Sequence, residues 1–299
     1  MPELPEVEVV RLFLESHLIG KKIIKLEILT PKSFIARPEH VEGIEGQKII
    51  STSRLGKQLS LYLQNGLILL FHLKMTGQII YSPLSLKGVS EGRGILGHPT
   101  KDAFGSLPNK STRLIFTLSD KSKLYFNDQR KFGWVKLLNQ AELIEVQKKI
   151  GIDLLSPKFT TKYFYTQLQS SLRPIKQILL DQSKFAGIGN IYANDALFLS
   201  HLHPQISSKK ITLSQAKILR HFLIKILKES ISQGGSTAKD NKYIHPDGSH
   251  GQHQFYFRVY QRQGEPCFVC HTPIKKIKIG SRGTFFCPVC QKPSVKILG

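Results

Sequence analysis

The length of 299 residues suggests about two domains, and the 40% hydrophobic and 9% aromatic content argues against a disordered protein. Its 43 lysine and arginine residues against 21 aspartate and glutamate residues give a formal net charge of +22, which favours nucleic acid as a partner. The apolar runs are too short to cross a bilayer, and no secretory signal opens the chain, so we expect a soluble cytoplasmic protein. An anionic membrane surface is the alternative partner, although no basic amphipathic helix stands out.

The first ten residues, MPELPEVEVV, are acidic and proline-rich although the chain as a whole is basic. Pro5 fits the first turn of a helix, and Glu6 and Glu8 fit the positive N-terminal end of its dipole. Apolar residues follow at helical spacing, and a glycine marks the end. The stretch therefore predicts a helix, which leaves Pro2 and Glu3 in front of it.

Alternating and β-branched apolar residues then predict strands between residues 22 and 80, in KKIIKLEIL, KIISTS and LSLYL. Asn65-Gly66 is a strong hairpin signal, and LIFTLSDKSKLYF followed by FGWVKLL predicts further paired strands. Residues 82–110, rich in Gly, Pro, Ser and Lys, indicate a long mobile loop. Residues 1–140 are therefore predicted to form a β-sandwich domain with an N-terminal helix.

Helical periodicity replaces the strand pattern from residue 140 onward. Gly234-Gly235 ends the last of the expected helices, which span 140–150, 160–171, 174–182, 190–200 and 212–232. FYFRVY, residues 255–260, then predicts a strand. We therefore expect an α+β multidomain protein with a helical domain at 141–235 and a C-terminal module at 236–299.

The cysteines all lie near the C-terminal end, in the pattern C-x2-C, sixteen residues, C-x2-C, at Cys267, Cys270, Cys287 and Cys290. This spacing is typical of one zinc ion in tetrahedral thiolate coordination; two disulfides or four unrelated thiols are the alternatives. A filled set of four thiolates leaves no position for an activated water, so the zinc would be structural. Six lysine and arginine residues and no acidic ones occur between positions 267 and 299, a positive charge suited to phosphate.

Pro2 and Glu3 offer a route to covalent chemistry at the start of the chain. A proline after the initiator methionine permits removal of Met1, which would leave a secondary amine at Pro2. A terminal amine has a pKa of about 8, so a fraction is nucleophilic near neutral pH and could attack C1′ of a sugar while Glu3 transfers a proton. Many proteins without such chemistry also begin with Met-Pro, so these residues alone do not decide.

Four stretches in chain order carry a family resemblance: MPELPEVE at the start, RLGKQL at 54–59, DQSKFAGIGNIYANDALF at 181–198 and GSRGTFFCPVCQ at 280–291. They resemble the opening, the strand-turn lysine motif, the helix-two-turn-helix and the zinc finger of bacterial formamidopyrimidine-DNA glycosylases. The resemblance runs through nearly the whole chain and implies a β-sandwich, a helix-two-turn-helix domain and a zinc-finger β-hairpin. The sister family, endonuclease VIII, typically begins with glycine where this chain has Leu4, so the branch that acts on oxidised purines is favoured.

The resemblance implies catalytic roles for four residues. Pro2 would be the Schiff-base nucleophile, and Glu3 the acid that helps to open the sugar. Lys57 would contact phosphate near the lesion and assist β-elimination, and Arg282 would bind phosphate and assist δ-elimination. Without the resemblance, Lys57 and Arg282 would be interpreted as ordinary surface cations.

The resemblance also implies DNA contacts by Met75, Arg130, Phe132, Lys176 and Asn190. The first three would fill the gap left by an extruded nucleotide, with Arg130 hydrogen-bonded to the orphaned base. Lys176 would contact phosphate, and Asn190 would cap a helix whose free N–H groups hold a phosphate. Taken singly, Phe132 looks like a core residue and Asn190 like a structural cap.

Three stretches depart from the family's pattern. Lys110-Ser111-Thr112-Arg113 lacks the histidines that often touch DNA there, and Arg113 could replace their charge. The 82–110 loop is longer than in many members. Residues 236–254, which correspond to the lesion-capping loop, differ from the common pattern.

The histidines suggest a further, weaker hypothesis. His245, His250 and His253 could form a second metal site, although solvated histidines are the simpler interpretation. His201 and His203, in HLHP, are expected to pack at a helix end.

The sequence therefore predicts a bifunctional DNA glycosylase/AP lyase of base excision repair with one structural Zn²⁺. It would excise oxidised purines such as 8-oxoguanine and formamidopyrimidines from double-stranded DNA, and cut the strand at these and at abasic sites by β,δ-elimination. We expect a monomer associated with the nucleoid. An endonuclease VIII-like preference for oxidised pyrimidines and a non-catalytic zinc-containing DNA-binding protein are the alternatives.

Overall fold

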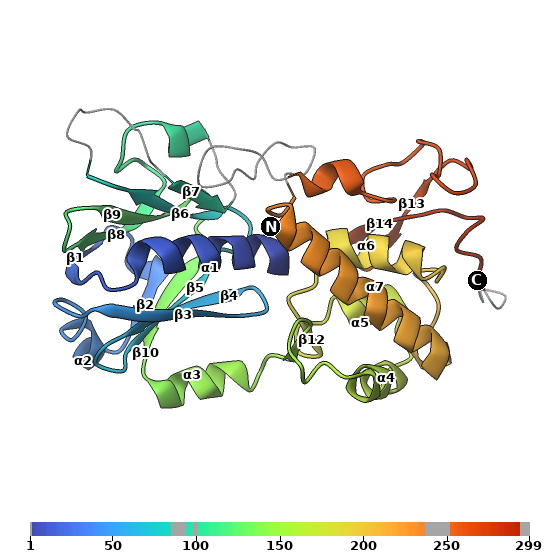
Figure 1. Ribbon diagram of the computed structural model, residues 1–299, viewed down its shortest axis with the longest axis horizontal. Helices are drawn as coiled ribbons and strands as arrows, with labels where there is room; N and C mark the ends of the chain where they lie inside the picture. The colour runs from blue at the N-terminus through green and yellow to red at the C-terminus, as the bar shows by residue number, and fades with distance from the viewer. Residues whose placement is uncertain (1, 85–93, 98–100, 237–251, 294–299) are drawn as a thin grey trace. The chain divides into compact units, whose positions relative to one another are not determined.

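The computed structural model describes residues 2–84, 94–97, 101–236 and 252–293 (Figure 1). The chain forms two compact units: Met1–Lys148 with Gln233–Gln252, and Lys149–Ser232 with His253–Gly299. The first unit holds a β-sandwich with the N-terminal helix, and the second holds helices followed by a hairpin. The predicted α+β fold class is therefore confirmed, while the domain boundaries near 140 and 235 stay a prediction.

Two sheets, each of five strands among the described residues, make up the sandwich of the first unit. One has the order β1-β8-β9-β6-β7, with β1 (Ile23–Ile28), β6 (Gly77–Ser82), β7 (Gly94–Gly97), β8 (Thr112–Leu118) and β9 (Lys123–Asp128). The other has the order β2-β10-β5-β4-β3, with β2 (Phe34–Ala36), β3 (Ile49–Leu55), β4 (Gln58–Leu63), β5 (Ile68–His72) and β10 (Trp134–Leu138). Neighbouring strands are antiparallel except for β2 and β10. The predicted turn at Asn65-Gly66 joins β4 to β5, and Gly66 has the positive φ of 85° that such turns favour.

Helix α1 (Leu4–Leu18) packs against β3, β4 and β7, which belong to both sheets (Figure 1). Its buried apolar residues recur every three or four positions, at Leu4, Val7, Val10, Leu14 and Leu18. Between the sheets, the Phe71 ring lies 6.3 Å from Phe116 and 6.2 Å from Phe126, centroid to centroid. Burying each such side chain contributes about 2 kcal/mol, so one large apolar cluster fixes the start of α1 to the sandwich.

Part of the 82–110 segment is ordered, so the prediction of a long mobile loop is wrong for the residues that the structure describes. Gly94–Gly97 forms β7 and pairs with β6, and Lys101–Phe104 forms the 3-10 helix η2. Ile95 and Ala103 are buried in an apolar cluster with side chains of the neighbouring strands. Short apolar pieces within a polar stretch therefore extend the sheet. Residues 85–93 and 98–100 lie outside the described part of the chain.

Short helices complete the first unit: η1 (Pro31–Ser33), α2 (Pro38–Val41) and α3 (Gln140–Gln147). Helix α3 begins with reciprocal caps, because the Asn139 side chain accepts from the Glu142 N–H at 3.0 Å and the Glu142 carboxylate accepts from the Asn139 N–H at 2.9 Å. Leu143 then packs on Ile68 and Leu70 of β5.

The second unit is helical up to the cysteine-rich end. Its helices are α4 (Thr161–Gln169), α5 (Ile175–Leu179), η3 (Ser208–Lys210), α6 (Asn190–Leu199), α7 (Leu213–Ser232) and η4 (His253–Tyr256), with a short parallel pair, β11 (Ile152–Asp153) and β12 (Phe185–Ala186). Gly234 follows α7 with a φ of 73°, which agrees with the predicted end of that helix. No helix in the described ranges is both long enough and apolar enough to span a membrane.

The hairpin of β13 (Lys275–Ile279) and β14 (Arg282–Phe286) follows in the same unit. Gly280 has a φ of 58° in the turn between the strands. A small apolar cluster beneath it includes Phe198 of α6, Val259, Ile274 and Phe285. The hairpin therefore rests on α6 through a core of few residues.

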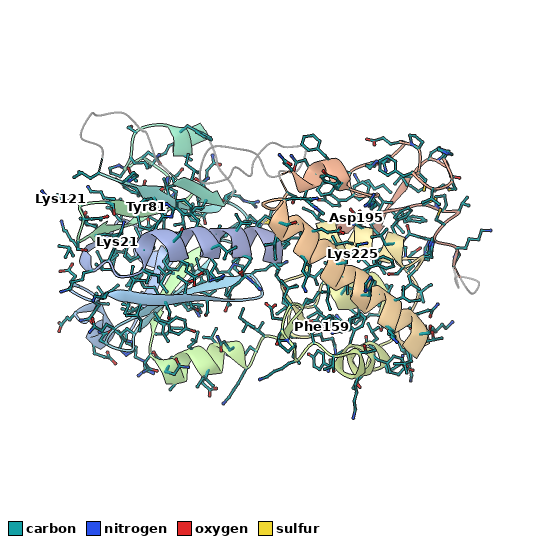
Figure 2. All side chains as sticks on the ribbon, viewed as in Figure 1. Lys21, Tyr81, Lys121, Phe159, Asp195 and Lys225 are labelled. Atoms are coloured by element: carbon teal, nitrogen blue, oxygen red, sulfur yellow. The ribbon has the colours of Figure 1, made fainter. Side chains whose placement is uncertain are left out.

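The predicted strand FYFRVY is wrong, since η4 and turns occupy these residues. The cause is Asp195 of α6 (Figure 2), whose buried carboxylate accepts hydrogen bonds from the backbone N–H groups of Arg258, Val259 and Tyr260 at 2.9, 3.1 and 3.1 Å. Burial raises the pKa of Asp195, and the three N–H donors oppose that rise. The backbone N–H groups of this segment thus bind one carboxylate instead of pairing with a neighbouring strand.

Candidate active site and metal centre

The amino terminus is held by the carboxylate of Glu6. Glu3 is the N-cap of α1, and its backbone N–H donates to Oε2 of Glu6 at 2.8 Å. The other oxygen of Glu6 accepts from the backbone N–H and the hydroxyl of Ser236, at 2.9 and 3.0 Å. Pro2, Glu3 and Glu6 are all buried. One side chain therefore fixes both the residue after Pro2 and the point where the 237–251 segment begins.

Sequence reasoning assigned Glu6 to the helix dipole and missed these partners. The spacing of Glu3 and Glu6, three residues apart before an apolar run, resembles a capping box and could have indicated the first contact. No signal in the sequence indicates the second, because Ser236 lies 230 residues away.

Lys57 lies in the two-residue turn between β3 and β4, where Leu55 pairs with Gln58. It is 7% exposed, so the interpretation as an ordinary solvated lysine is wrong. Gly56 before it has a φ of 59°, a conformation that glycine adopts at little cost. The turn thus places a cation in a defined and largely enclosed position.

Arg54 connects this turn to α1. Its guanidinium donates to the Gly56 carbonyl at 3.0 Å and to the Glu8 carboxylate at 2.7 Å. Burial opposes ionisation of Glu8, but its hydrogen bonds and ion pairs with Arg11 and Arg54 prevail and lower its pKa. The glutamates of the acidic opening stretch therefore have separate partners, with Glu6 at the terminus and Glu8 at the lysine turn.

His72, at the end of β5, was not singled out from the sequence. Its ring lies 5.4 Å from that of Trp134, and its Nδ1 accepts from the Lys74 N–H at 3.1 Å. Burial, together with the positive charges of Lys74 and Lys57, lowers the pKa of His72 to about 3. The imidazole is therefore neutral at physiological pH and adds no charge beside Lys57.

The three residues expected to enter DNA lie on two neighbouring loops of the first unit. Met75 follows β5 and is partly exposed, whereas Arg130 and Phe132 lie between β9 and β10. Phe132 is 54% exposed, so its interpretation as a core residue is wrong. The Arg130 guanidinium carbon lies 4.8 Å from the centre of the Phe132 ring. A cation and an apolar ring thus lie side by side in the same loop.

Arg113, which could replace the charge of the family's histidines, is buried in the structure. It is 6% exposed, and its Nε donates to the carbonyl of Asp128 at 2.9 Å. Burial lowers the pKa of Arg113, against the opposing influence of the Asp128 charge. The guanidinium thus holds the end of β9 through the Asp128 carbonyl.

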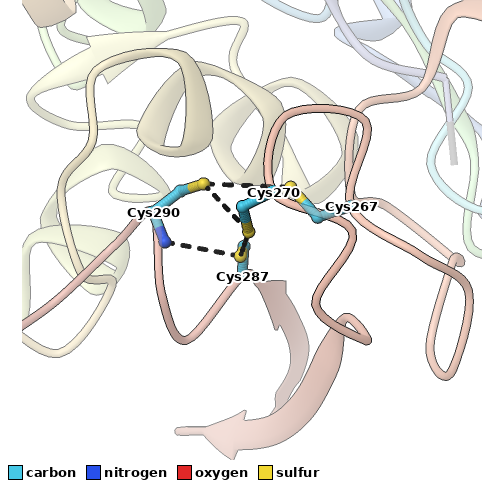
Figure 3. Close-up of side chains that lie close together, drawn as sticks. All are labelled: Cys267, Cys270, Cys287 and Cys290. Atoms are coloured by element: carbon cyan, nitrogen blue, oxygen red, sulfur yellow. Dashed lines mark hydrogen bonds between the residues drawn. The ribbon is translucent and has the colours of Figure 1, made fainter.

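The four cysteine sulfurs converge as a metal site requires (Figure 3). All lie within 4.8 Å of one another, and three of the Sγ–Sγ distances are 3.4, 3.5 and 3.9 Å. Sulfurs around a tetrahedral zinc ion are about 3.8 Å apart, whereas a disulfide bond is about 2.05 Å long. The disulfide alternative is therefore excluded, and the four thiolates form a site for one structural Zn²⁺.

Asn190 is bonded to the hairpin that carries Arg282 in the second unit. The N-cap of α6 is Gly189, so the prediction of Asn190 as a helix cap is wrong. The Asn190 amide instead donates to the Gly283 carbonyl at 3.0 Å, while Oδ1 of Asn194, one turn later, accepts from the Phe285 N–H at 3.0 Å. Helix α6 therefore holds β14 through two side-chain hydrogen bonds. The first residue of β14, Arg282, is exposed.

Lys176 and the histidines complete the second unit. Lys176 lies in α5 and is fully buried. His245 and His250 lie outside the described residues, and His253 is buried with its ring 5.5 Å from that of Tyr192. His203 packs on Phe286 as expected, with ring centroids 4.7 Å apart. Among the described residues, the cysteines form the one group at metal-ligating distances.

Comparison with known proteins covers both units. Three family models match: the formamidopyrimidine-DNA glycosylase N-terminal domain at 1–135, the formamidopyrimidine-DNA glycosylase H2TH domain at 150–242, and the zinc finger found in FPG and IleRS at 264–293. The chain belongs to the formamidopyrimidine-DNA glycosylase family. The resemblance inferred from the four motifs is therefore confirmed.

Relatives within this family match over their full length. The formamidopyrimidine-DNA glycosylases of Listeria innocua and Streptococcus mutans are 37% and 38% identical, over 98% of this chain and 100% of their own. A mutant of the Lactococcus lactis FPG, solved with DNA containing Fapy-dG, has a TM-score of 0.84 at 32% identity, covering 98% of this chain and 100% of that one. The Lactococcus lactis Fpg solved with DNA containing an abasic site has a TM-score of 0.83 at 32% identity, covering 97% and 100%.

The two units of this glycosylase family member divide the candidate residues between them. The first carries Pro2, Glu3, Lys57 and the loops of Met75 and Phe132. The second carries the remaining candidates, Lys176, Asn190, Arg282 and the zinc ligands. The candidate nucleophile thus belongs to the sandwich unit, and the metal centre lies beside the hairpin of the other unit.

Proposed function

We propose that this protein is a bifunctional DNA glycosylase/AP lyase of base excision repair that removes oxidised purines, such as 8-oxoguanine and formamidopyrimidines. The observation that carries the proposal is the match along 98% of the chain to formamidopyrimidine-DNA glycosylases, with Pro2 and Glu3 at the start of α1. Relatives bound to DNA with Fapy-dG or an abasic site support double-stranded DNA with these lesions as the substrate. The protein would act as a monomer in the cytoplasm, on the nucleoid.

The reaction begins with Pro2 after removal of Met1. The secondary amine attacks C1′ of the extruded nucleotide, the bond to the base breaks, and Glu3 supplies the proton that opens the sugar. The product is an iminium ion that joins the chain to the sugar. The backbone hydrogen bond between Glu3 and Glu6 supports this proposal, since it holds the residue next to Pro2 in one conformation.

Strand cleavage follows from the iminium ion by two eliminations. Loss of a proton from C2′ expels the 3′ phosphate, and a second elimination expels the 5′ phosphate. Lys57 would bind the phosphate near the lesion and assist the first step, and Arg282 would assist the second. The enclosed turn of Lys57 and the exposed position of Arg282 on a positive hairpin are compatible with these roles.

Extrusion of the damaged nucleotide costs a few kcal/mol, which a wedge in the vacated space offsets. Met75 and Phe132 would supply apolar surface, and Arg130 would hydrogen-bond the orphaned base. Asn190 would hold a phosphate that flanks it, and Lys176, which is buried in α5, is given the same role by the family resemblance alone. The exposure of Phe132 and the adjacent Arg130 guanidinium support this assignment.

Borohydride trapping tests the nucleophile. Reduction of the iminium ion should link the protein covalently to DNA that contains 8-oxoguanine, and Pro2→Gly or retention of Met1 should abolish the linked product. Pro5→Ala, which changes another proline of the same helix start, is the matched control and should be trapped like the wild type. Trapping that persists in Pro2→Gly would move the nucleophile to a lysine.

Substrate comparison tests the specificity. Matched duplexes with an oxidised purine or an oxidised pyrimidine should show faster excision of the purine. The reverse order would favour the endonuclease VIII-like alternative, and DNA binding without any trapping would leave a non-catalytic binding protein.

A further inference from the structure

One buried carboxylate joins the two loops that carry the proposed wedge. Asp128, the last residue of β9, is fully buried. Its Oδ1 accepts from the Thr76 hydroxyl and from the Arg130 N–H, the latter at 3.1 Å. Its Oδ2 accepts from the Gly133 N–H at 2.6 Å. The same side chain thus bonds to the Met75 loop and closes the Arg130–Phe132 turn.

Each of these partners of the Asp128 carboxylate is a wedge residue or its neighbour in the chain. Thr76 follows Met75, Arg130 is itself a wedge residue, and Gly133 follows Phe132. The Thr76 hydroxyl also accepts from the Arg130 N–H at 3.2 Å, so it lies at the junction of the two loops. A shift of the carboxylate would therefore move Met75 relative to the Arg130–Phe132 turn.

The backbone leaves little room for other arrangements around this carboxylate. A Cβ at Gly133 would lie 3.1 Å from Oδ2 of Asp128 and 2.9 Å from the Phe126 ring. Lys74 and Lys131, one in each loop, have positive φ values of 51° and 58°, which residues other than glycine seldom adopt. Such a conformation persists where surrounding contacts fix it.

The backbone of Asp128 is also held by hydrogen bonds at the start of the neighbouring strand. Its backbone N–H donates to the Ser111 carbonyl at 2.8 Å, and its carbonyl accepts from Arg113. Ser111 and Arg113, from the stretch in which the sequence departs from the family's histidines, therefore hold the backbone from which the carboxylate extends.

We propose that Asp128 and Thr76 are positioning residues that hold the Met75 loop and the Arg130–Phe132 turn at one spacing. The three side chains then enter the duplex as a single preorganised wedge, and Arg130 meets the orphaned base in a fixed orientation. The inference rests on the proposed function, because it concerns the wedge of that reaction. It assigns opposite-base discrimination in part to two residues that do not touch DNA.

Thr76→Val tests the link, because it removes the hydroxyl and leaves the other contacts of Asp128 in place. Excision of 8-oxoguanine from a duplex should fall about tenfold, whereas cleavage of an abasic site in single-stranded DNA, which has no opposite base to read, should change less than about twofold. The ratio of excision rates opposite cytosine and adenine should move towards one. Asp128→Asn should have a larger effect, because the NH2 group of its amide would face the N–H of either Gly133 or Arg130.

Matched variants separate positioning from general destabilisation. Thr76→Ser keeps the hydroxyl and should restore both the duplex rate and the opposite-base ratio. Thr117→Val makes the same substitution at a partly exposed site on β8 and should behave as wild type. A Thr76→Val variant with an unchanged ratio, or one that loses activity equally on all substrates, would overturn this inference alone. An inactive, untrappable wild type would overturn the proposed function and the inference with it.

Discussion

The sandwich and the zinc finger hold their functional residues by different means. In the sandwich, the carboxylates of Glu6 and Asp128 accept hydrogen bonds from backbone N–H groups, and that of Glu8 accepts one from an arginine. An extensive apolar core supports these contacts. In the finger, side chains of α6 form hydrogen bonds with the hairpin. The apolar core of the finger is small and includes two of the cysteines, Cys267 and Cys287. The sandwich can therefore lose a polar contact and keep its fold, whereas the metal is part of the fold of the finger.

The difference predicts two kinds of variant. Changes to the carboxylates of the sandwich should alter rates and specificity while the protein stays folded. Changes to the zinc ligands should remove metal, hairpin structure and DNA affinity together. The following experiments test this contrast, from the largest expected effect to the smallest.

Cys290→Ala should abolish zinc binding and weaken binding to abasic-site DNA by about 100-fold or more, because the hairpin of Arg282 loses its support. Metal content by mass spectrometry and a fluorescence binding assay measure the two effects. Val289→Ala alters an exposed neighbour in the same turn and should leave both unchanged. Full DNA affinity without zinc would show that the hairpin does not need the metal.

Acid should destabilise the sandwich through His72. The pKa of His72 is lowered to about 3 in the folded chain, so the unfolded chain takes up the proton first as pH falls below the ordinary histidine range. The free energy of unfolding should drop by about 2 kcal/mol from this residue between pH 7 and pH 5. His72→Asn should remove that part of the pH dependence.

Trp134 makes the measurement specific to the sandwich. It is the sole tryptophan of the chain and lies beside the His72 ring, so its fluorescence in urea reports unfolding of the first unit. His221→Gln, at an exposed position in the second unit, should leave the pH dependence as in the wild type. An identical pH dependence in His72→Asn would refute the assignment.

Glu8→Gln should have the smallest effect. It leaves Arg54 bonded to Gly56 but removes the charge that opposes it, which should lower the free energy of unfolding by about 1 kcal/mol. Cleavage of an abasic site should slow about threefold as the turn of Lys57 loosens. Glu15→Gln removes the exposed partner of Arg11 and should change neither quantity measurably. Equal effects of the two variants would show that the Arg54 link does not position the turn.

Local patterns allowed much of the fold to be predicted. Alternation indicated the strands, periodicity the helices, and cysteine spacing the metal site, because each depends on residues close together in sequence. FYFRVY shows where this fails: the segment has the pattern of a strand, but the carboxylate of Asp195 takes its N–H groups.

The arrangement of the candidate site was harder to predict. The links from Glu6 to Ser236 and from Thr76 to Asp128 join distant positions through single side chains. Nothing in a run of neighbouring residues marks such a partner. The exposure of Phe132 likewise depends on how its turn is held, and not on its apolar character.

The shared carboxylate of Glu6 has a consequence for how this enzyme could diversify. Ser236 attaches the segment that follows it in the chain to the same side chain that orders the reactive end. Because one carboxylate serves both contacts, a substitution at Ser236 would disturb the start of α1 across 230 residues of sequence. Ser236 and Glu6 are therefore expected to change together rather than singly as the sequence diverges.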